Sequence, residues 1–222
     1  MSAAVAVVLL SMMSLLSAWA GVALAIRTGD SDRAIAGGIG FSVGMMLVIS
    51  LLELIPEASV AIGVRATMMS FALGAGLVWT AHVLIPHIHL VEERGMADKA
   101  LVRSAYLIML GLILHDVPEG IAMANAYLAS PSLGVLVSVA IALHNIPEEF
   151  AMALPALLTR SKRLLYGAAL LSALAEPAGA IVGLVATGFA PRLNGHFMAF
   201  AAGAMTFISL HELLPMARRH GH

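Results

Sequence analysis

The chain contains 222 residues, of which 60% are hydrophobic and 11% are charged, and its formal net charge is −1. Soluble domains average about 45–50% apolar and about 25% charged residues, so this composition excludes an ordinary soluble fold and indicates a membrane protein. The sequence has no basic stripe suited to nucleic acid. Because it has no cysteine, any metal site must use His, Asp, Glu, Asn or Met.

Seven apolar segments are long enough to cross a bilayer as helices, which takes about 20 residues. They predict one all-α transmembrane domain over residues 1–222, with spans at 3–26, 35–56, 66–86, 102–127, 133–158, 164–188 and 196–216. The first segment could instead be a cleaved signal peptide, because Ala18-Trp19-Ala20 resembles a cleavage site. Its length and the lack of a positive N-terminal region favour a span.

The basic residues predict the orientation of these spans. All of the 12 Lys and Arg residues except Arg65 and Arg192 fall on one side of the predicted membrane domain. The side richer in Lys and Arg is normally cytoplasmic. We therefore expect a multi-pass protein of the cell (inner) membrane, with its N-terminus outside and its C-terminus in the cytoplasm.

Two short motifs nearly copy each other: His-Asp-Val-Pro-Glu at 115–119 and His-Asn-Ile-Pro-Glu at 144–148. A helix places residues four apart on one face, so each His shares a face with the Glu of its own motif. Two such helices side by side would gather imidazole and carboxylate groups, which suit a divalent transition metal such as zinc. A polar pair that only links helices is the alternative, which the duplication weakens. The predicted ligands are His115, Glu119, His144 and Glu148.

Further polar residues lie close to these motifs in the sequence. We expect Asp116 and Asn145 to bind a second metal that the two motif glutamates bridge, although they could instead only support the ligands through hydrogen bonds. Glu176, in the middle of a span, is a candidate ligand of the same metal, and a protonated structural acid is the alternative. Glu149 could join this second site or pair with a polar group on another helix.

Other candidates lie nearer the membrane surfaces. Glu53 lies toward the predicted outer end of its helix and could form an entrance for the ion. A polar set at the predicted cytoplasmic ends of two helices could form an exit relay, and ordinary interfacial histidines are the alternative. This set comprises His82, His87, His89, His211 and Glu212.

Residues 44–56 and 203–215 repeat each other at a constant offset. An odd number of predicted crossings separates them, so the repeat is inverted, an organisation common in secondary transporters. Chance similarity between Gly-, Ala- and Leu-rich helices is the alternative, but a shared Glu and a shared Pro argue against it. The matching pairs include Gly44/Gly203, Met46/Met205, Glu53/Glu212 and Pro56/Pro215.

Together these features resemble the ZIP (Zrt/Irt-like) family of metal transporters, especially its bacterial and archaeal members. The resemblance rests on the two His-x-x-Pro-Glu motifs and on the strings at 51–56, 175–177 and 211–215. It implies a binuclear site on the fourth and fifth spans, an elevator-like motion, a homodimer in membrane lipid, and zinc uptake toward the cytoplasm. It also implies that Met45 or Met46 caps the first metal, with core packing as the alternative.

The sequence also departs from the family. Its members usually have eight spans, whereas seven are predicted here. The repeat would place a counterpart of the third span beyond residue 222, so the eighth helix is either absent or lies outside these residues. Asp116 replaces the Asn of many relatives, and Glu149 stands where prokaryotic relatives often have Gly.

The predicted function is transport of a divalent metal ion rather than catalysis. A membrane-embedded dimetal enzyme is the alternative, but no His-Glu-x-x-His motif is present. A metal sensor would need a sizeable soluble output domain, and export instead of uptake stays open. The donor set suits Zn²⁺, and also Fe²⁺, Mn²⁺, Co²⁺ or Cd²⁺.

Overall fold

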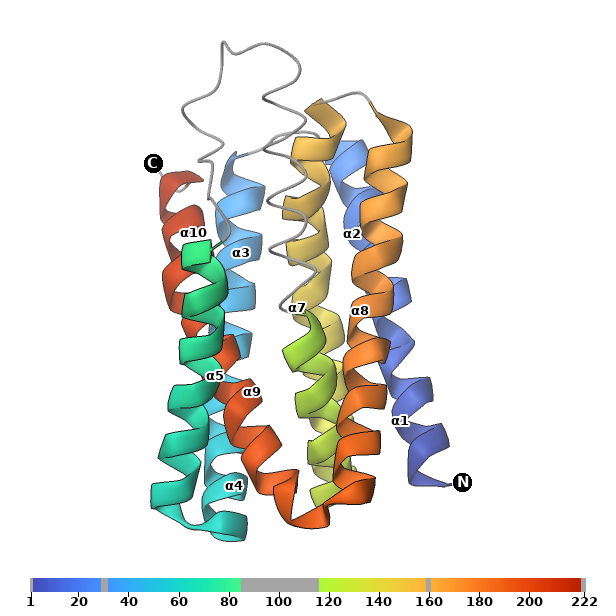
Figure 1. Ribbon diagram of the computed structural model, residues 1–222. Helices are drawn as coiled ribbons and strands as arrows, with labels where there is room; N and C mark the ends of the chain where they lie inside the picture. The colour runs from blue at the N-terminus through green and yellow to red at the C-terminus, as the bar shows by residue number, and fades with distance from the viewer. Residues whose placement is uncertain (1, 29–31, 85–115, 159–160, 221–222) are drawn as a thin grey trace.

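The computed structural model describes residues 2–28, 32–84, 116–158 and 161–220, and every regular element in these ranges is helical. This confirms the all-α membrane class (Figure 1). An unlabelled helix covers residues 116–129. The labelled elements are α1 (Ala3–Ser11), α2 (Met13–Thr28), α3 (Asp32–Val48), η1 (Ile49–Leu54), α4 (Ile55–Ile62), α5 (Val64–Leu84), α7 (Pro131–Leu158), α8 (Lys162–Phe189), η3 (Pro191–Leu193), α9 (Asn194–Ile208), η4 (Ser209–Leu213) and α10 (Leu214–His220).

Five helical stretches are long and apolar enough to cross a membrane, and they overlap five of the seven predicted spans. They are Ala3–Arg27, Ala36–Ile62, Pro131–Leu154, Lys162–Phe189 and Pro191–His211. The third predicted span, 66–86, coincides with α5, a helix of 21 residues that is not among these five. The fourth, 102–127, lies outside the described residues up to position 115 and is helical from 116 onward.

The first predicted span is not one continuous helix, because a turn at Met12 separates α1 from α2. Two serine hydroxyls beside the turn donate to the backbone: Ser11 to the Val8 carbonyl and Ser14 to the Ser11 carbonyl. Such bonds compete with the regular helical ladder and bend helices. The apolar segment 3–26 therefore contains a helix break at Met12, beside the serines Ser11 and Ser14.

The second predicted span, 35–56, continues six residues further, to Ile62. Proline normally ends or kinks a helix, because its ring clashes with the carbonyl four residues earlier. Here Pro56 follows the π-helical turn η1, in which the Ile55 N–H bonds to the Ser50 carbonyl, five residues back. We infer that this wider turn makes room for the proline ring, so that the helix runs on.

The second repeat string contains the same feature. The π-helical turn η4 precedes Pro215, and the Leu214 N–H bonds to the Ser209 carbonyl. The two strings also touch, since the Ser209 hydroxyl donates to the Met46 sulfur at 3.4 Å. The two strings therefore resemble each other in backbone geometry as well as in sequence. Such π-helical turns are rare and occur frequently at functional sites.

The helices form two groups of neighbours (Figure 1). In the repeat group, which contains α3, η1, α4, α5, α9, η4 and α10, α5 lies along α9, and α10 lies along α3. In the motif group, which contains α1, α2, the 116–129 helix, α7 and α8, α2 lies against both α7 and α8. Among the labelled elements, the contacts between the groups run mainly through α3 and α7.

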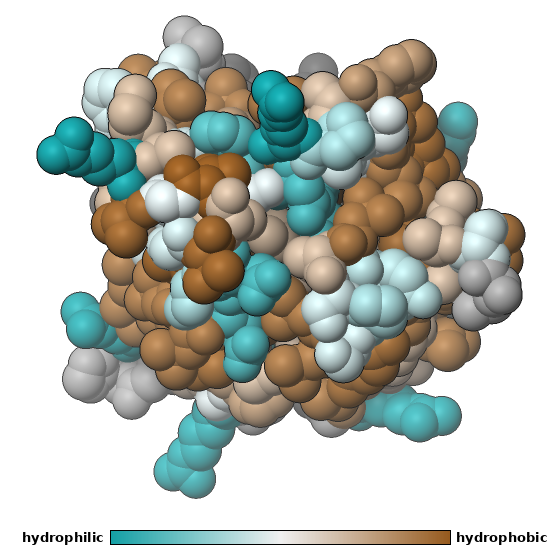
Figure 2. Space-filling model, turned by 90° about the horizontal axis from the view of Figure 1, so that it is seen from below, coloured by the Kyte–Doolittle hydropathy of each residue, from teal (hydrophilic) through white to brown (hydrophobic). Residues whose placement is uncertain are grey.

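Large apolar side chains remain exposed on the outside of the bundle, among them Leu16, Leu73 and Leu171. Seen from the end at which α1 begins, hydrophobic residues cover much of the rim, and hydrophilic ones are scattered among them (Figure 2). In water such exposure would favour aggregation, whereas lipid chains solvate these side chains.

Glycines let the 116–129 helix and α8 pack backbone against backbone. A Cβ atom built on Gly120 would overlap the Glu176 carbonyl oxygen, and one built on Gly179 would overlap the Val117 carbonyl oxygen. Small residues at such crossings allow membrane helices to approach closely. This contact brings Glu176 and the second half of the first His-Glu motif to the same level of the bundle.

The Gly179→Ala variant is expected to be destabilised by about 1–3 kcal/mol or more, because the added methyl group must push two backbones apart. Thermal unfolding in detergent measures this effect. The matched control is Gly188→Ala in the same helix, where an added Cβ meets nothing within 4 Å and little change is expected. Equal losses in the two variants would contradict the packing explanation.

Candidate metal site

Glu119, His144 and Glu148 form the centre of the site. The 116–129 helix supplies Glu119 and α7 supplies the other two, and their ligand atoms lie within 4.8 Å of one another. Their exposed fractions are 0%, 0% and 5%. A buried carboxylate pair beside an imidazole is costly unless it binds a cation or is fully hydrogen-bonded. His115, the fourth predicted ligand, lies outside the described residues.

The His144 ring is oriented by its own helix. Its Nδ1 lies 2.9 Å from the Ala140 carbonyl oxygen, which can only accept, so Nδ1 carries a hydrogen. Its Nε2 lies 3.1 Å from Glu119 Oε1. Both of these atoms have lone pairs, so the space between them holds a shared hydrogen or a cation. A metal ion bound by both atoms would replace that hydrogen.

The backbone around the second motif is held by hydroxyl groups from neighbouring helices. Pro147 has no N–H, which removes a donor from the α7 ladder at this level. Ser42 of α3 donates to the His144 carbonyl oxygen and Ser17 of α2 to the Ala142 carbonyl oxygen, each at 2.7 Å. Such side-chain donors make irregular helix geometry tolerable within a membrane.

Asn145 and Glu176 meet next to the first cluster. Asn145 Nδ2 donates to Glu176 Oε2 at 3.2 Å, and both residues are buried. Within the described part of the chain, Asn145 Oδ1 and Glu119 Oε2 have no hydrogen-bond partner. An unsatisfied buried oxygen is costly, so two of them beside one cluster suit a ligand that supplies positive charge.

Asp116 and Glu149 are joined through a residue that no sequence motif singled out. The Ser172 hydroxyl of α8 lies 2.5 Å from Asp116 Oδ2 and also hydrogen-bonds Glu149 Oε1. Glu149 thus contacts a polar group on another helix, one of the two alternatives that the sequence left open. A signal for Ser172 was available, because it precedes Glu176 by one helical turn and shares its face.

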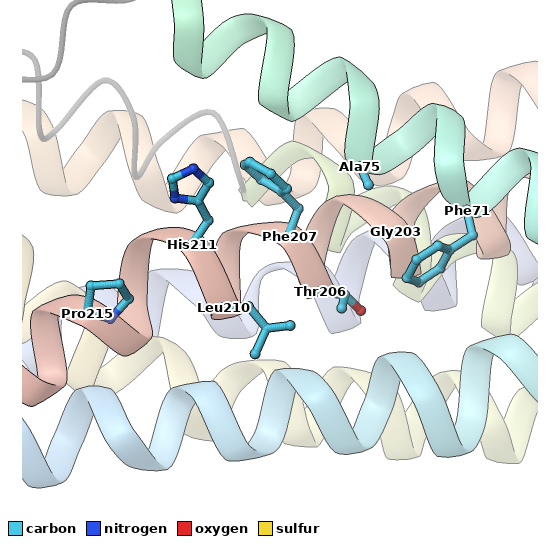
Figure 3. A pocket seen from close by; sticks show the side chains of 8 residues that line it. All are labelled: Phe71, Ala75, Gly203, Thr206, Phe207, Leu210, His211 and Pro215. Carbon is cyan, nitrogen blue, oxygen red and sulfur yellow. The ribbon is translucent and has the colours of Figure 1, made fainter.

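The remaining candidates lie in the repeat group. Met46 is fully buried, and its sulfur accepts the hydrogen bond from Ser209. Glu53 is half-buried in η1. His211 lies edge-on to Phe207, with ring centroids 4.8 Å apart, and lines an open cavity of about 450 Å³ between α5 and α9 (Figure 3). No residue of the buried cluster lines this cavity.

The side chains of four of the five predicted exit residues cannot be placed. The backbone positions of His82 and Glu212 belong to α5 and η4, but their side chains lie outside what the structure describes. His87 and His89 lie outside the described residues altogether. Of the predicted metal ligands, the described residues bring Glu119, His144 and Glu148 together, pair Asn145 with Glu176 and place Asp116 against Ser172. His211 lines a separate cavity.

A helical membrane protein with several spans and a buried imidazole–carboxylate cluster has the organisation of a metal ion transporter. Residues 86–222 match the profile of a family described as ZIP Zinc transporter. The chain is 36% identical over 204 residues to the zinc transporter ZupT of Chlorobium chlorochromatii, covering 82% of this chain and 76% of the relative. For the zinc transporter ZupT of Corynebacterium efficiens, identity is 37% over 223 residues, covering 90% and 82%.

A third relative, the zinc transporter ZupT of Chlorobium luteolum, is 33% identical over 237 residues, covering 97% of this chain and 89% of the relative. The chain therefore belongs to the ZIP family. It is a divalent metal transporter and not an enzyme, as the sequence predicted.

Proposed function

We propose that this protein takes up zinc toward the cytoplasm and that the ion binds at Glu119, His144 and Glu148, with His115 as a further ligand. The observation that carries this proposal is the burial of two carboxylates and one imidazole within 4.8 Å of one another, inside a bundle of apolar helices. The curated relatives are named zinc transporters. Imidazole and carboxylate ligands in a compact cluster suit Zn²⁺, and also Fe²⁺, Mn²⁺, Co²⁺ or Cd²⁺.

The site is proposed to hold two ions bridged by Glu119 and Glu148. The second ion would be bound by Asp116, Asn145 and Glu176. The support is the direct contact of Asn145 with Glu176 and the unsatisfied Oδ1 of Asn145 beside it. Met46 is the proposed cap of the first ion, since it lies in α3, the element of the repeat group that packs against α7.

Transport is proposed to occur by an elevator-like movement of the motif group against the repeat group. Two observations support this: the groups meet mainly along α3 and α7, and the repeat group contains both strings of the proposed inverted repeat. The ion would enter past Glu53 from outside and leave toward a cytoplasmic polar set. Four members of the predicted polar set would lie on this path: His82, His87, His211 and Glu212. The protein is proposed to work as a homodimer in the inner membrane with its N-terminus outside.

Zinc uptake into proteoliposomes tests the transport proposal. We expect saturable uptake of radioactive zinc that exceeds the uptake of empty liposomes, and competition by unlabelled metals ranks the ions. Uptake by cells that express the protein, compared with efflux from zinc-loaded cells, tests the direction. Stoichiometric zinc binding without flux in either assay would contradict the proposal.

Zinc affinity is expected to decrease as the pH falls from about 7 to about 5, because protons compete for the ligand lone pairs. By the same exchange, zinc binding should release protons. Competition with a fluorescent chelator at each pH gives the affinity, and a weakly buffered solution shows the release. A dissociation constant that stays the same over this range would contradict imidazole and carboxylate ligation.

A further inference from the structure

Ser172 joins two carboxylates that come from different helices. Asp116 stands at the start of the 116–129 helix, Glu149 lies on α7, and Ser172 lies on α8 between them. The exposed fractions of Asp116, Ser172 and Glu149 are 5%, 4% and 6%. The contact therefore ties together three elements of the motif group at a point shielded from solvent and lipid.

This arrangement places two acidic groups against one small hydroxyl. The hydroxyl has a single hydrogen, so it can donate to only one of the two carboxylates at a time. Both motifs lie between Arg103 and Arg160, and this stretch of the sequence contains no Lys or Arg that could neutralise the carboxylates. Repulsion between two carboxylates is strong in surroundings of low polarity. A divalent cation bound at Asp116 would reduce this repulsion.

The same face of α8 reaches both halves of the proposed second ion site. Ser172 contacts Asp116 and Glu149, and Glu176, one helical turn later, contacts Asn145. The backbone contact of Gly179 with Val117 leaves α8 little freedom to shift relative to the 116–129 helix. The Ser172 hydroxyl is therefore held against Asp116 Oδ2.

We propose that Ser172 is a positioning residue for the second ion: it orients Asp116 and links it to Glu149. This inference rests on the proposed function, in which Asp116 binds the second ion. Ser172 itself needs no contact with the metal. Groups that orient a metal ligand commonly change metal affinity by about 10–100-fold when they are removed.

Isothermal titration calorimetry of the purified full-length protein with Co²⁺ in detergent tests this inference, because the heat of binding reports each equivalent that binds. In Ser172→Ala we expect the second equivalent to bind about 10–100-fold more weakly and the first to bind as in the wild type. Ser172→Cys keeps nearly the same volume but donates weakly, and we expect the same selective loss. It provides the test if Ser172→Ala does not fold.

The matched control is Ser138→Ala. Ser138 is equally buried, but its hydroxyl donates to the Gly134 carbonyl within its own helix, so both equivalents should bind normally. Unchanged binding of the second equivalent in both Ser172 variants would overturn the inference. So would the same loss in Ser138→Ala.

Glu119→Ala separates this inference from the proposed function. If Glu119→Ala binds and transports like the wild type, the proposed function itself is wrong. If Glu119→Ala is inactive and Ser172→Ala still binds its second ion normally, the proposed function stands and only the positioning role of Ser172 fails.

Discussion

Replacement of Glu119 by Ala is expected to reduce zinc uptake by at least about 100-fold, which is the upper end of the loss caused by removing a residue that merely supports a ligand. Glu119 is fully buried, its Oε1 contacts His144 Nε2, and its Oε2 has no hydrogen-bond partner among the described residues. Its carboxylate is the proposed bridge between both ions. Initial rates of zinc uptake in proteoliposomes with equal amounts of protein measure the effect.

Glu57→Ala is the matched control for this variant. Glu57 is a half-buried carboxylate in the first turn of α4, in the repeat group, and no proposed ion contact involves it. Uptake by Glu57→Ala should stay close to that of the wild type. Normal zinc flux in Glu119→Ala would contradict the proposed site, whatever the result for the control.

Replacement of Gly38 by Leu is expected to stop transport and to leave metal binding in place. Gly38 lies on α3 where the two helix groups meet, and an added Cβ would lie 2.8 Å from the Cβ of Pro147 on α7. A larger side chain at this crossing would prevent the two groups from sliding past each other, because a packed interface has no room for added volume. Glu119, His144 and Glu148 all lie within the motif group, so we expect these three ligands to stay together, whereas the proposed Met46 cap belongs to the repeat group.

The measurement compares flux in proteoliposomes with metal stoichiometry in detergent. Gly37→Leu is the control, because the neighbouring Gly37 lies on the same helix and an added Cβ there meets nothing within 4 Å. We expect Gly37→Leu to transport and Gly38→Leu to bind without transport. Transport at the wild-type rate by Gly38→Leu would refute a sliding interface between α3 and α7.

The sequence determined the class of protein and much of the proposed metal site. The length of an apolar segment indicates whether it can span the membrane as a helix. A bilayer provides no water to bond the backbone, so a spanning segment must satisfy its backbone hydrogen bonds internally. Helical spacing fixes which residues of one helix share a face, so His144 and Glu148 could be assigned together. Duplication of the motif then indicated that a second helix contributes the partner Glu119, and the structure brings these three residues together.

Tertiary structure alone decided the contacts between helices, because a one-dimensional pattern does not specify which faces meet. Glu149 contacts Ser172, whose residue type is common on membrane helices and whose only signal in the sequence is its position one helical turn before Glu176. Met46 likewise contacts Ser209 from the other repeat string. The π-turns that carry the chain past Pro56 and Pro215 depend on backbone bonding that residue type does not reveal.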